Sequence, residues 1–176
     1  MFSKLLLALA IALPLTAQQH TDITINSVIA EMNRERAEMG LLPLREDSRL
    51  EAAANDRMKD MEDLGYWAHV SPDGRVPFVW YHPHGYNYSN AGENLASGFE
   101  TAEVLMESWM ESPGHRDNIM NPLYSDCGIA IIDGSTTGPA TGKSIVVLFG
   151  RPMVEYVEEP PVRRPALSAP ASVPRP

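Results

Sequence analysis

The composition of the two ends of the chain confines any packed domain to residues 22–150. At the amino end, Lys4 precedes an apolar run over residues 5–13, which is followed by Pro14 and small residues. The run is too short to cross a bilayer comfortably, and the pattern is typical of a secretory signal peptide, which we place at residues 1–18. We therefore expect a secreted, extracytoplasmic protein in the periplasm, in the cell envelope or outside the cell. An uncleaved anchor is the alternative.

The carboxyl end, residues 151–176, is rich in Pro, Val, Ala, Glu and Arg. Such a segment buries too little apolar surface to offset its ordering entropy, so we expect a Pro-rich flexible tail. The whole chain is 44% hydrophobic and 21% charged, which is typical of a soluble globular protein. Its net charge of -9 argues against a nucleic-acid partner. We also expect no stable membrane span after removal of the signal.

Cys127 is the single cysteine of the chain, so no disulfide can form within it. Stability must come from an apolar core, although the expected compartment is oxidising. Cys127 opens an apolar run, and we interpret it as a buried structural thiol. A reactive thiol is the alternative, and it would need a base such as His115 beside it.

Helical spacing of apolar residues marks two helices in the first part of the domain. The first begins near Ile25 and ends at Gly40. The second begins at Ser48, with Glu51 three residues later, a spacing that predicts a capping box. Both helices precede the first histidine motif of the domain.

The second part of the domain predicts one more helix and two strands. Residues 101–112 have the pattern of a helix that is broken by the following Pro-Gly pair. Residues 127–132 and 143–149 have the pattern of strands joined by a Gly- and Thr-rich loop. Residues 78–90 show no periodicity, and we expect an irregular segment that serves as a lid or a pocket wall. This order of elements predicts an α+β fold.

Four short motifs carry more specific information, and they are Trp67–Gly74, Ala91–Ala96, Trp109–Ile119 and Cys127–Ile131. In this order the motifs resemble those of the CAP superfamily, the cysteine-rich secretory, antigen 5 and pathogenesis-related 1 proteins. The domain of this family is also called SCP, and the chain is similar to its secreted bacterial members. The resemblance implies a three-layer α-β-α sandwich with a central, mostly antiparallel sheet over residues 22–150.

The resemblance also implies a cavity lined by two His and two Glu, which holds a divalent metal in several members of the family. Matched motif by motif, the first His is His69, the first Glu is Glu93 and the second His is His115. Neutral imidazoles are good ligands for ions such as Zn, so His69 and His115 are the candidate metal ligands. Glu93 is the candidate catalytic residue, because a carboxylate can activate a metal-bound water.

Two further sets of residues are candidates for this cavity. The second Glu of the family corresponds to Ser112 here, so we take Glu111, one residue earlier, as the fourth cavity residue. Glu107 is a more distant substitute on another face of the same helix. His82 and His84 form an alternate pair in the irregular segment, and they are a weaker candidate for metal binding.

Each site residue also has a simpler interpretation. His69 can be a loop histidine bonded to backbone, Glu93 a carboxylate that caps exposed N–H groups, and His115 a ring packed on Trp109. Taken singly, these interpretations are favoured. Taken together under the family pattern, a shared cavity is favoured.

These observations support three hypotheses of function. The first is an extracellular binding or interaction module whose ligand is a lipid, a peptide or a cell-wall component. The second is a divalent-metal-dependent hydrolase of peptides or cell-wall material that uses the same cavity. The third is a structural envelope protein in which the tail matters more than the cavity. The sequence has no Ser or Cys nucleophile motif and no phosphate-binding Gly loop, so acyl-transfer and nucleotide chemistry lack support.

Overall fold

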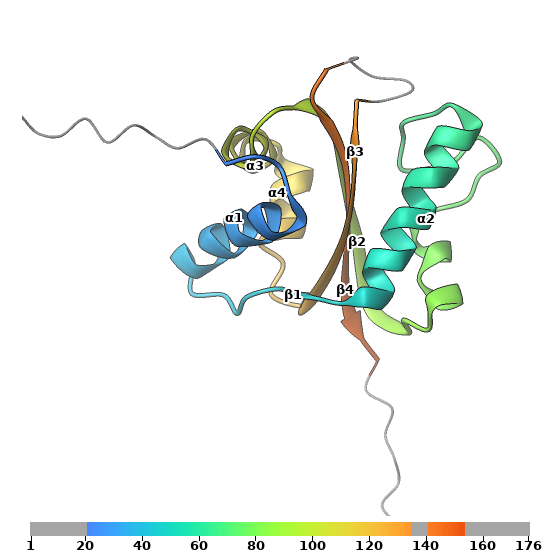
Figure 1. Cartoon of the computed structure of the whole chain (residues 1–176). Coiled ribbons are helices and arrows are strands. Elements are labelled where there is room, and N and C mark those ends of the chain that lie inside the picture. The colour runs from blue at the N-terminus through green and yellow to red at the C-terminus, as the bar shows by residue number, and fades with distance from the viewer. Residues whose placement is uncertain (1–20, 135–140, 154–176) are drawn as a thin grey trace, which may run out of the picture.

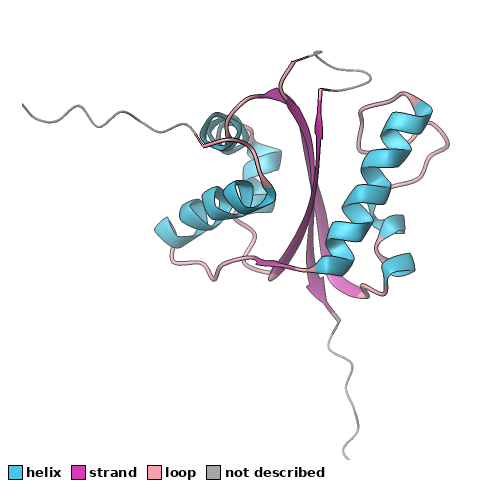
Figure 2. Ribbon diagram, viewed as in Figure 1, coloured by secondary structure: helices cyan, strands magenta, loops and turns pink. Residues whose placement is uncertain are grey.

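The computed structural model describes residues 21–134 and 141–153, which form three layers (Figure 1). A four-stranded sheet lies in the middle, with helices against both of its faces (Figure 2). The predicted α+β fold, a three-layer α-β-α sandwich, is confirmed. The signal peptide predicted at residues 1–18 and residues 154–176 of the predicted tail lie outside the described residues. Within the described ranges, no helix is both long enough and apolar enough to cross a membrane.

The sheet is mostly antiparallel, as predicted. Its strands are β1 (Arg45–Glu46), β2 (Tyr88–Phe99), β3 (Asp126–Asp133) and β4 (Lys143–Pro152). Their order is β1-β3-β4-β2, in which β1 runs parallel to β3 and the other two pairs are antiparallel. β3 and β4 contain the predicted strands 127–132 and 143–149. β4 continues through Arg151 and Pro152, so the sheet extends past the expected end of the domain at residue 150.

The sequence analysis predicted neither the two-residue strand β1 nor the long strand β2. The residues at the centre of β2, 92–96, are buried, because helices cover both faces of the sheet. Two of these residues, Glu93 and Asn94, are polar, so neither an apolar run nor a simple alternation marks the strand. β2 includes the last three residues of segment 78–90, which we expected to be irregular. Most of the rest forms two short 3-10 helices, η1 (Pro77–Trp80) and η2 (His82–His84).

Helices cover the two faces of the sheet unequally (Figures 1 and 2). α1 (Ile25–Glu38), α3 (Ala102–Glu111) and α4 (Pro113–Ile119) lie on one face. α2 (Ser48–Leu64) lies on the other face, together with η1 and η2. Each face has its own apolar cluster, one around Trp109 and Phe149 and the other around Tyr81 and Leu148.

The start of α2 differs in detail from its prediction. The N-cap is Asp47, whose side chain accepts a hydrogen bond of 2.9 Å from the backbone N–H of Arg49. Ser48 is therefore the first helical residue, and the predicted capping box of Ser48 with Glu51 is wrong. Asp is as good an N-cap as Ser, and the carboxylate also pairs with the Arg49 guanidinium at 2.6 Å.

α2 packs directly on β3 at Gly128. A Cβ atom at this position would lie 2.0 Å from the backbone carbon of Leu50, so only glycine allows the helix to approach this closely. The neighbouring Cys127 is fully buried, and burial raises the pKa of its thiol to about 12. The thiol is thus kept protonated and away from solvent, which agrees with its interpretation as a structural residue.

Arg36 is a buried arginine that joins α1 to the segment between α4 and β3. Its guanidinium donates hydrogen bonds only to backbone carbonyls, those of Leu42 (2.8 Å), Ile119 (2.7 Å), Asn121 (3.0 Å) and Tyr124 (3.2 Å). Four backbone carbonyls are satisfied in this way, and the bonds to Ile119 and Tyr124 are buried. Burial lowers the pKa of Arg36, but an arginine remains charged under all ordinary conditions.

Candidate functional site

A pocket of about 320 Å³ lies along β2, where the loop that follows α2 approaches α4. Two of the predicted site residues, His69 and Glu93, line this pocket. The other residues of its wall are Val76, Pro77, Phe78, Ala91, Gly92 and Asn118. The wall therefore combines a few polar side chains with an apolar surface, as small-molecule and peptide sites commonly do.

His69 and Glu93 form a direct pair. Nδ1 of His69 lies 2.7 Å from Oε1 of Glu93. The Glu93 side chain is only 2% exposed, whereas the His69 side chain is 57% exposed. This hydrogen bond raises the pKa of His69 above its ordinary value. Because a carboxylate only accepts hydrogen bonds, neutral His69 carries its proton on Nδ1 and leaves Nε2 as a bare acceptor.

The second carboxylate oxygen of Glu93 accepts a hydrogen bond from Arg57, a residue that the sequence analysis did not single out. Nε of Arg57 donates to Oε2 of Glu93 at 2.9 Å, and the Arg57 side chain is fully buried. The available signal was its position on α2, where Ala54, Arg57, Met58 and Met61 share the buried face. A charged residue on an apolar helix face requires a partner, and here the partner is a site residue.

His115, the second predicted His, lies on α4 near this pair but does not line the pocket. Its ring lies 6.1 Å from the ring of Trp109, as the simpler interpretation expected. Burial lowers the pKa of His115, and the positive charge of His69 lowers it further. The two imidazoles are therefore close enough to repel each other when charged.

Two asparagines attach α4 to β2 beside the pocket. Asn94 donates to the backbone carbonyl of His115 at 3.1 Å. Asn118 donates to the backbone carbonyl of Glu93 at 3.0 Å and to the side-chain oxygen of Asn94 at 2.8 Å. These bonds hold α4, which carries His115, to β2, which carries Glu93. The two motifs are thereby brought together even though the His115 ring stays outside the pocket wall.

The remaining candidates are placed elsewhere. Glu111 and Glu107 are both exposed on α3, and neither lines the pocket. The place of Glu111 in a four-residue cavity thus stays a prediction. His82 and His84 have separate partners, since His82 pairs with Asn87 at 3.1 Å and His84 with Asp56 at 2.8 Å.

As the side chains are arranged here, the pocket does not present a complete set of ligands for a divalent metal. Across residues 21–134 and 141–153, no three His, Cys, Asp or Glu side chains come together as a candidate metal group. Both carboxylate oxygens of Glu93 are engaged, one by Arg57 and one by His69. The pocket wall offers one imidazole nitrogen, Nε2 of His69, and a Zn site needs three or four protein ligands.

Gly92 has a specific role in the Gly-Glu-Asn motif. A Cβ atom here would lie 2.5 Å from the hydroxyl oxygen of Tyr124 and 2.8 Å from Oδ1 of Asn118. The Tyr124 hydroxyl donates to the carbonyl of Ala91 at 2.9 Å, so it cannot move away without losing that bond. Glycine is therefore needed for Tyr124 and Asn118 to reach β2 together.

Side chains donate hydrogen bonds to alternate backbone carbonyls of β2, one of the two edge strands of the described sheet. The pairs are Tyr124 Oη to Ala91 O at 2.9 Å, Asn118 Nδ2 to Glu93 O at 3.0 Å and Trp109 Nε1 to Leu95 O at 3.4 Å. Alternate residues of an antiparallel strand direct their backbone groups to the same side. The edge acceptors beside the pocket are thus already bound within the domain.

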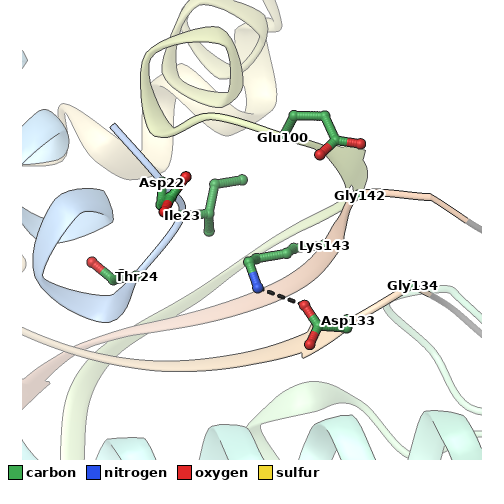
Figure 3. Close-up of a pocket in the computed structure, with 8 residues that line it drawn as sticks. All are labelled: Asp22, Ile23, Thr24, Glu100, Asp133, Gly134, Gly142 and Lys143. Carbon is green, nitrogen blue, oxygen red and sulfur yellow. Dashed lines mark hydrogen bonds and ion pairs between the residues drawn. The ribbon is translucent and has the colours of Figure 1, made fainter. Parts of the chain in front are cut away.

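Figure 3 shows a larger hollow of about 570 Å³, and no histidine is among its lining residues. It is lined by the carboxylates of Asp22, Glu100 and Asp133, and Lys143 pairs with Asp133 at 2.5 Å. Three carboxylates with one ammonium group and the Thr24 hydroxyl form an acidic surface without an imidazole. We therefore place the candidate site at His69 and Glu93 rather than here.

Comparison with known proteins relates the chain to one protein family and to a bacterial relative. A sequence model of the cysteine-rich secretory protein family, CAP, matches residues 29–147, which include all four predicted site residues. The uncharacterized protein YkwD of Bacillus subtilis is 38% identical over 109 residues, which are 62% of this chain and 42% of that protein. The chain thus spans less than half of the length of this relative.

Two solved structures are similar in fold. One is an outer surface protein from Borrelia burgdorferi, with a TM-score of 0.64 and 22% identity over 77% of this chain and 100% of that chain. The other is an extracellular protein containing an SCP domain from Bacillus anthracis, with a TM-score of 0.60 and 25% identity. This second match covers 72% of our chain and 39% of that chain.

Proposed function

The chain belongs to the cysteine-rich secretory protein (CAP) family, and from this membership we propose that it is a binding module that acts outside the cytoplasm through the pocket at His69 and Glu93. The extracytoplasmic location is supported by similarity to an extracellular SCP-domain protein. It is also supported by the signal peptide expected at residues 1–18.

The observation that carries the binding role is that Glu93 is buried and bonded to the His69 ring, whereas His69 itself is exposed. Glu93 is buried and engaged by two partners, so it orients the imidazole. His69 is exposed, and its Nε2 is the ring atom remote from Glu93. A ligand that donates a hydrogen bond to Nε2 and places an apolar group against Phe78 matches this wall. Amide and hydroxyl groups next to apolar groups occur in peptides and in cell-wall peptides, the ligand class that we favour.

The hydrolase hypothesis requires more than the pocket provides. It assigns Glu93 as the general base and His69 and His115 as metal ligands. The Glu93 carboxylate is engaged by Arg57 and His69, and the His115 ring lies outside the pocket wall. A positioning role for Glu93 is therefore better supported by the geometry than a role as a base. The metal site stays a prediction, which metal analysis can test directly.

A titration with soluble cell-wall muropeptides, followed by amide NMR shifts of the full chain, tests the binding role. We expect shifts around Phe78, Gly92 and Asn118, and a loss of affinity of at least about fivefold in His69→Ala, since a lost hydrogen bond to an exposed group costs about 1 kcal/mol or more. His84→Ala is the matched control, because His84 is paired with Asp56 away from the pocket. Equal binding by both variants, or shifts confined to other surfaces, would contradict the proposal.

A further inference from the structure

The domain contains two fully buried arginines with different surroundings. Arg36 donates to four backbone carbonyls and has no carboxylate partner in its hydrogen bonds. Arg57 instead donates to the Glu93 carboxylate. Burying a guanidinium is costly unless its charge and its donors are satisfied. The two residues therefore have the same burial but different chemical purposes, and each can serve as a control for the other.

Arg57 holds the neighbours of His69 on two sides. Its Nε donates to Oε2 of Glu93, whose Oε1 binds the His69 ring. Its Nη2 donates to the carbonyl of Ala68, the residue directly before His69. One planar group thus fixes both the hydrogen-bond partner of the imidazole and the backbone that carries it. Lysine has a single nitrogen in place of this fork and cannot make both contacts with the same geometry.

A second set of contacts keeps the Arg57 guanidinium in place. The ring of Trp80 lies 4.8 Å from its central carbon, which is within the range of a cation–π contact. Nη1 donates to the Tyr66 hydroxyl, which in turn donates to Asp60. Asp60 also accepts a hydrogen bond of 2.7 Å from Arg75, at the far end of the His69 loop. The loop that carries His69 is therefore attached to α2 near both of its ends, through Ala68 and through Arg75.

We propose that Arg57 is the positioning residue of the pocket, which turns the Glu93 carboxylate toward His69 and so presents Nε2 of His69 to the ligand as a bare acceptor. The inference rests on the proposed function, because it explains how the binding atom is set. It assigns Arg57 no contact with the ligand. A carboxylate that is buried without its cation takes up a proton or turns away, and either change releases the imidazole.

The tautomer of His69, read from ring nitrogen shifts in two-dimensional NMR spectra of the full chain, tests this role without any ligand. The spectra are recorded at a pH where the ring is neutral. We expect the wild-type ring to carry its proton on Nδ1. In the isosteric variant Glu93→Gln, Arg57 still donates a hydrogen bond to the side chain of residue 93. Only the amide oxygen of glutamine can accept this bond, so the oxygen turns toward Arg57. The amide NH₂ then faces His69, so the proton must move to Nε2.

The result that overturns the proposal is a Glu93→Gln variant that keeps its proton on Nδ1. In that case the amide oxygen faces His69, and Arg57 does not set the orientation of residue 93. Arg57→Met is expected to lose the uniform Nδ1 tautomer, and Arg57→Lys to recover part of it. Arg36→Met, the matched control, is expected to lower the melting temperature and leave the tautomer unchanged. A change of tautomer in Arg36→Met would equally refute a specific role for Arg57.

These outcomes separate the inference from the proposed function. Because the tautomer is measured without ligand, a failed muropeptide titration leaves the expected NMR result unaffected. The converse result is muropeptide binding that depends on His69 in a protein whose Glu93→Gln variant keeps the Nδ1 tautomer. That pair of results would support the proposed binding pocket and reject Arg57 as its positioning residue. Should Arg57→Met fail to fold, Glu93→Gln decides the question alone, since its side chain has the same shape as the original.

Discussion

Replacement of Gly92 by alanine is the sharpest test of how the pocket is built. The added Cβ would lie 2.5 Å from the Tyr124 hydroxyl and 2.8 Å from Oδ1 of Asn118, whereas ordinary contact begins at 3.4 Å. Both side chains must move, and each holds a carbonyl of β2, at Ala91 and at Glu93. Two lost hydrogen bonds cost about 0.5–1.5 kcal/mol each. Overpacking adds about 1–3 kcal/mol.

We therefore expect Gly92→Ala to lower the free energy of unfolding by about 2–6 kcal/mol. The assay is urea denaturation followed by tryptophan fluorescence, with an unchanged slope required for the comparison. Gly114→Ala is the matched control, because a Cβ at Gly114, on helix α4, meets no atom within 4 Å. This control should be neutral or stabilising by up to about 1 kcal/mol.

A second variant separates the clash with the hydroxyl from a general effect of alanine. Tyr124→Phe removes the hydroxyl oxygen, so that the nearest remaining atom of this ring lies 3.0 Å from the added methyl group. The double variant Gly92→Ala/Tyr124→Phe should thus be more stable than the sum of the single effects predicts, by about 0.5–3 kcal/mol, the range typical of residues in contact. Destabilisation of Gly92→Ala below about 0.5 kcal/mol, or strict additivity, would refute the steric reasoning.

Four further predictions concern ionisable groups and metal binding. His69 should titrate above the ordinary value of 6.5 and His115 below it in NMR titrations, because Glu93 stabilises the charged form of His69 and burial disfavours that of His115. The raised pKa of His69 contributes stability that is fully present below pH 6.5 and is lost as the pH rises through the folded-state pKa. The lowered pKa of His115 has the opposite effect, since protonation of His115 destabilises the folded protein as the pH falls. In denaturation curves measured at several pH values, Glu93→Gln should remove the contribution of His69. Cys127 should not react with a thiol reagent at neutral pH until the protein unfolds, and rapid labelling of the native protein would contradict its burial. Metal analysis should find less than one equivalent of Zn, and a full equivalent that is lost in both His69→Ala and His115→Ala would instead establish the metal site.

The sequence predicted the elements whose local pattern and environment agree. The strands at 127–132 and 143–149 are apolar runs bounded by turn residues, and they form β3 and β4. β2 was missed because its buried centre contains Glu93 and Asn94, whose burial depends on partners from distant parts of the chain. Local periodicity cannot register such partners.

The candidate site shows the same division. Motif matching placed His69 and Glu93 in one pocket, and the structure joins them by a hydrogen bond. It did not find Arg57, because no neighbouring residue in the sequence indicates its role and the relevant partner lies on β2. For His115, the motif predicted proximity to Glu93, but the direction of a ring on a helix depends on how that helix packs.

The occupied carbonyls of β2 limit how this edge of the sheet can pair with another chain. An edge strand with unpaired backbone groups can form hydrogen bonds with a strand of another chain, which leads to aggregation. Here a phenol, an amide and an indole already satisfy the acceptors of Ala91, Glu93 and Leu95. Another chain could pair with these three carbonyls only after the side-chain bonds broke, so we expect side chains rather than main-chain pairing to select a ligand of the adjoining pocket.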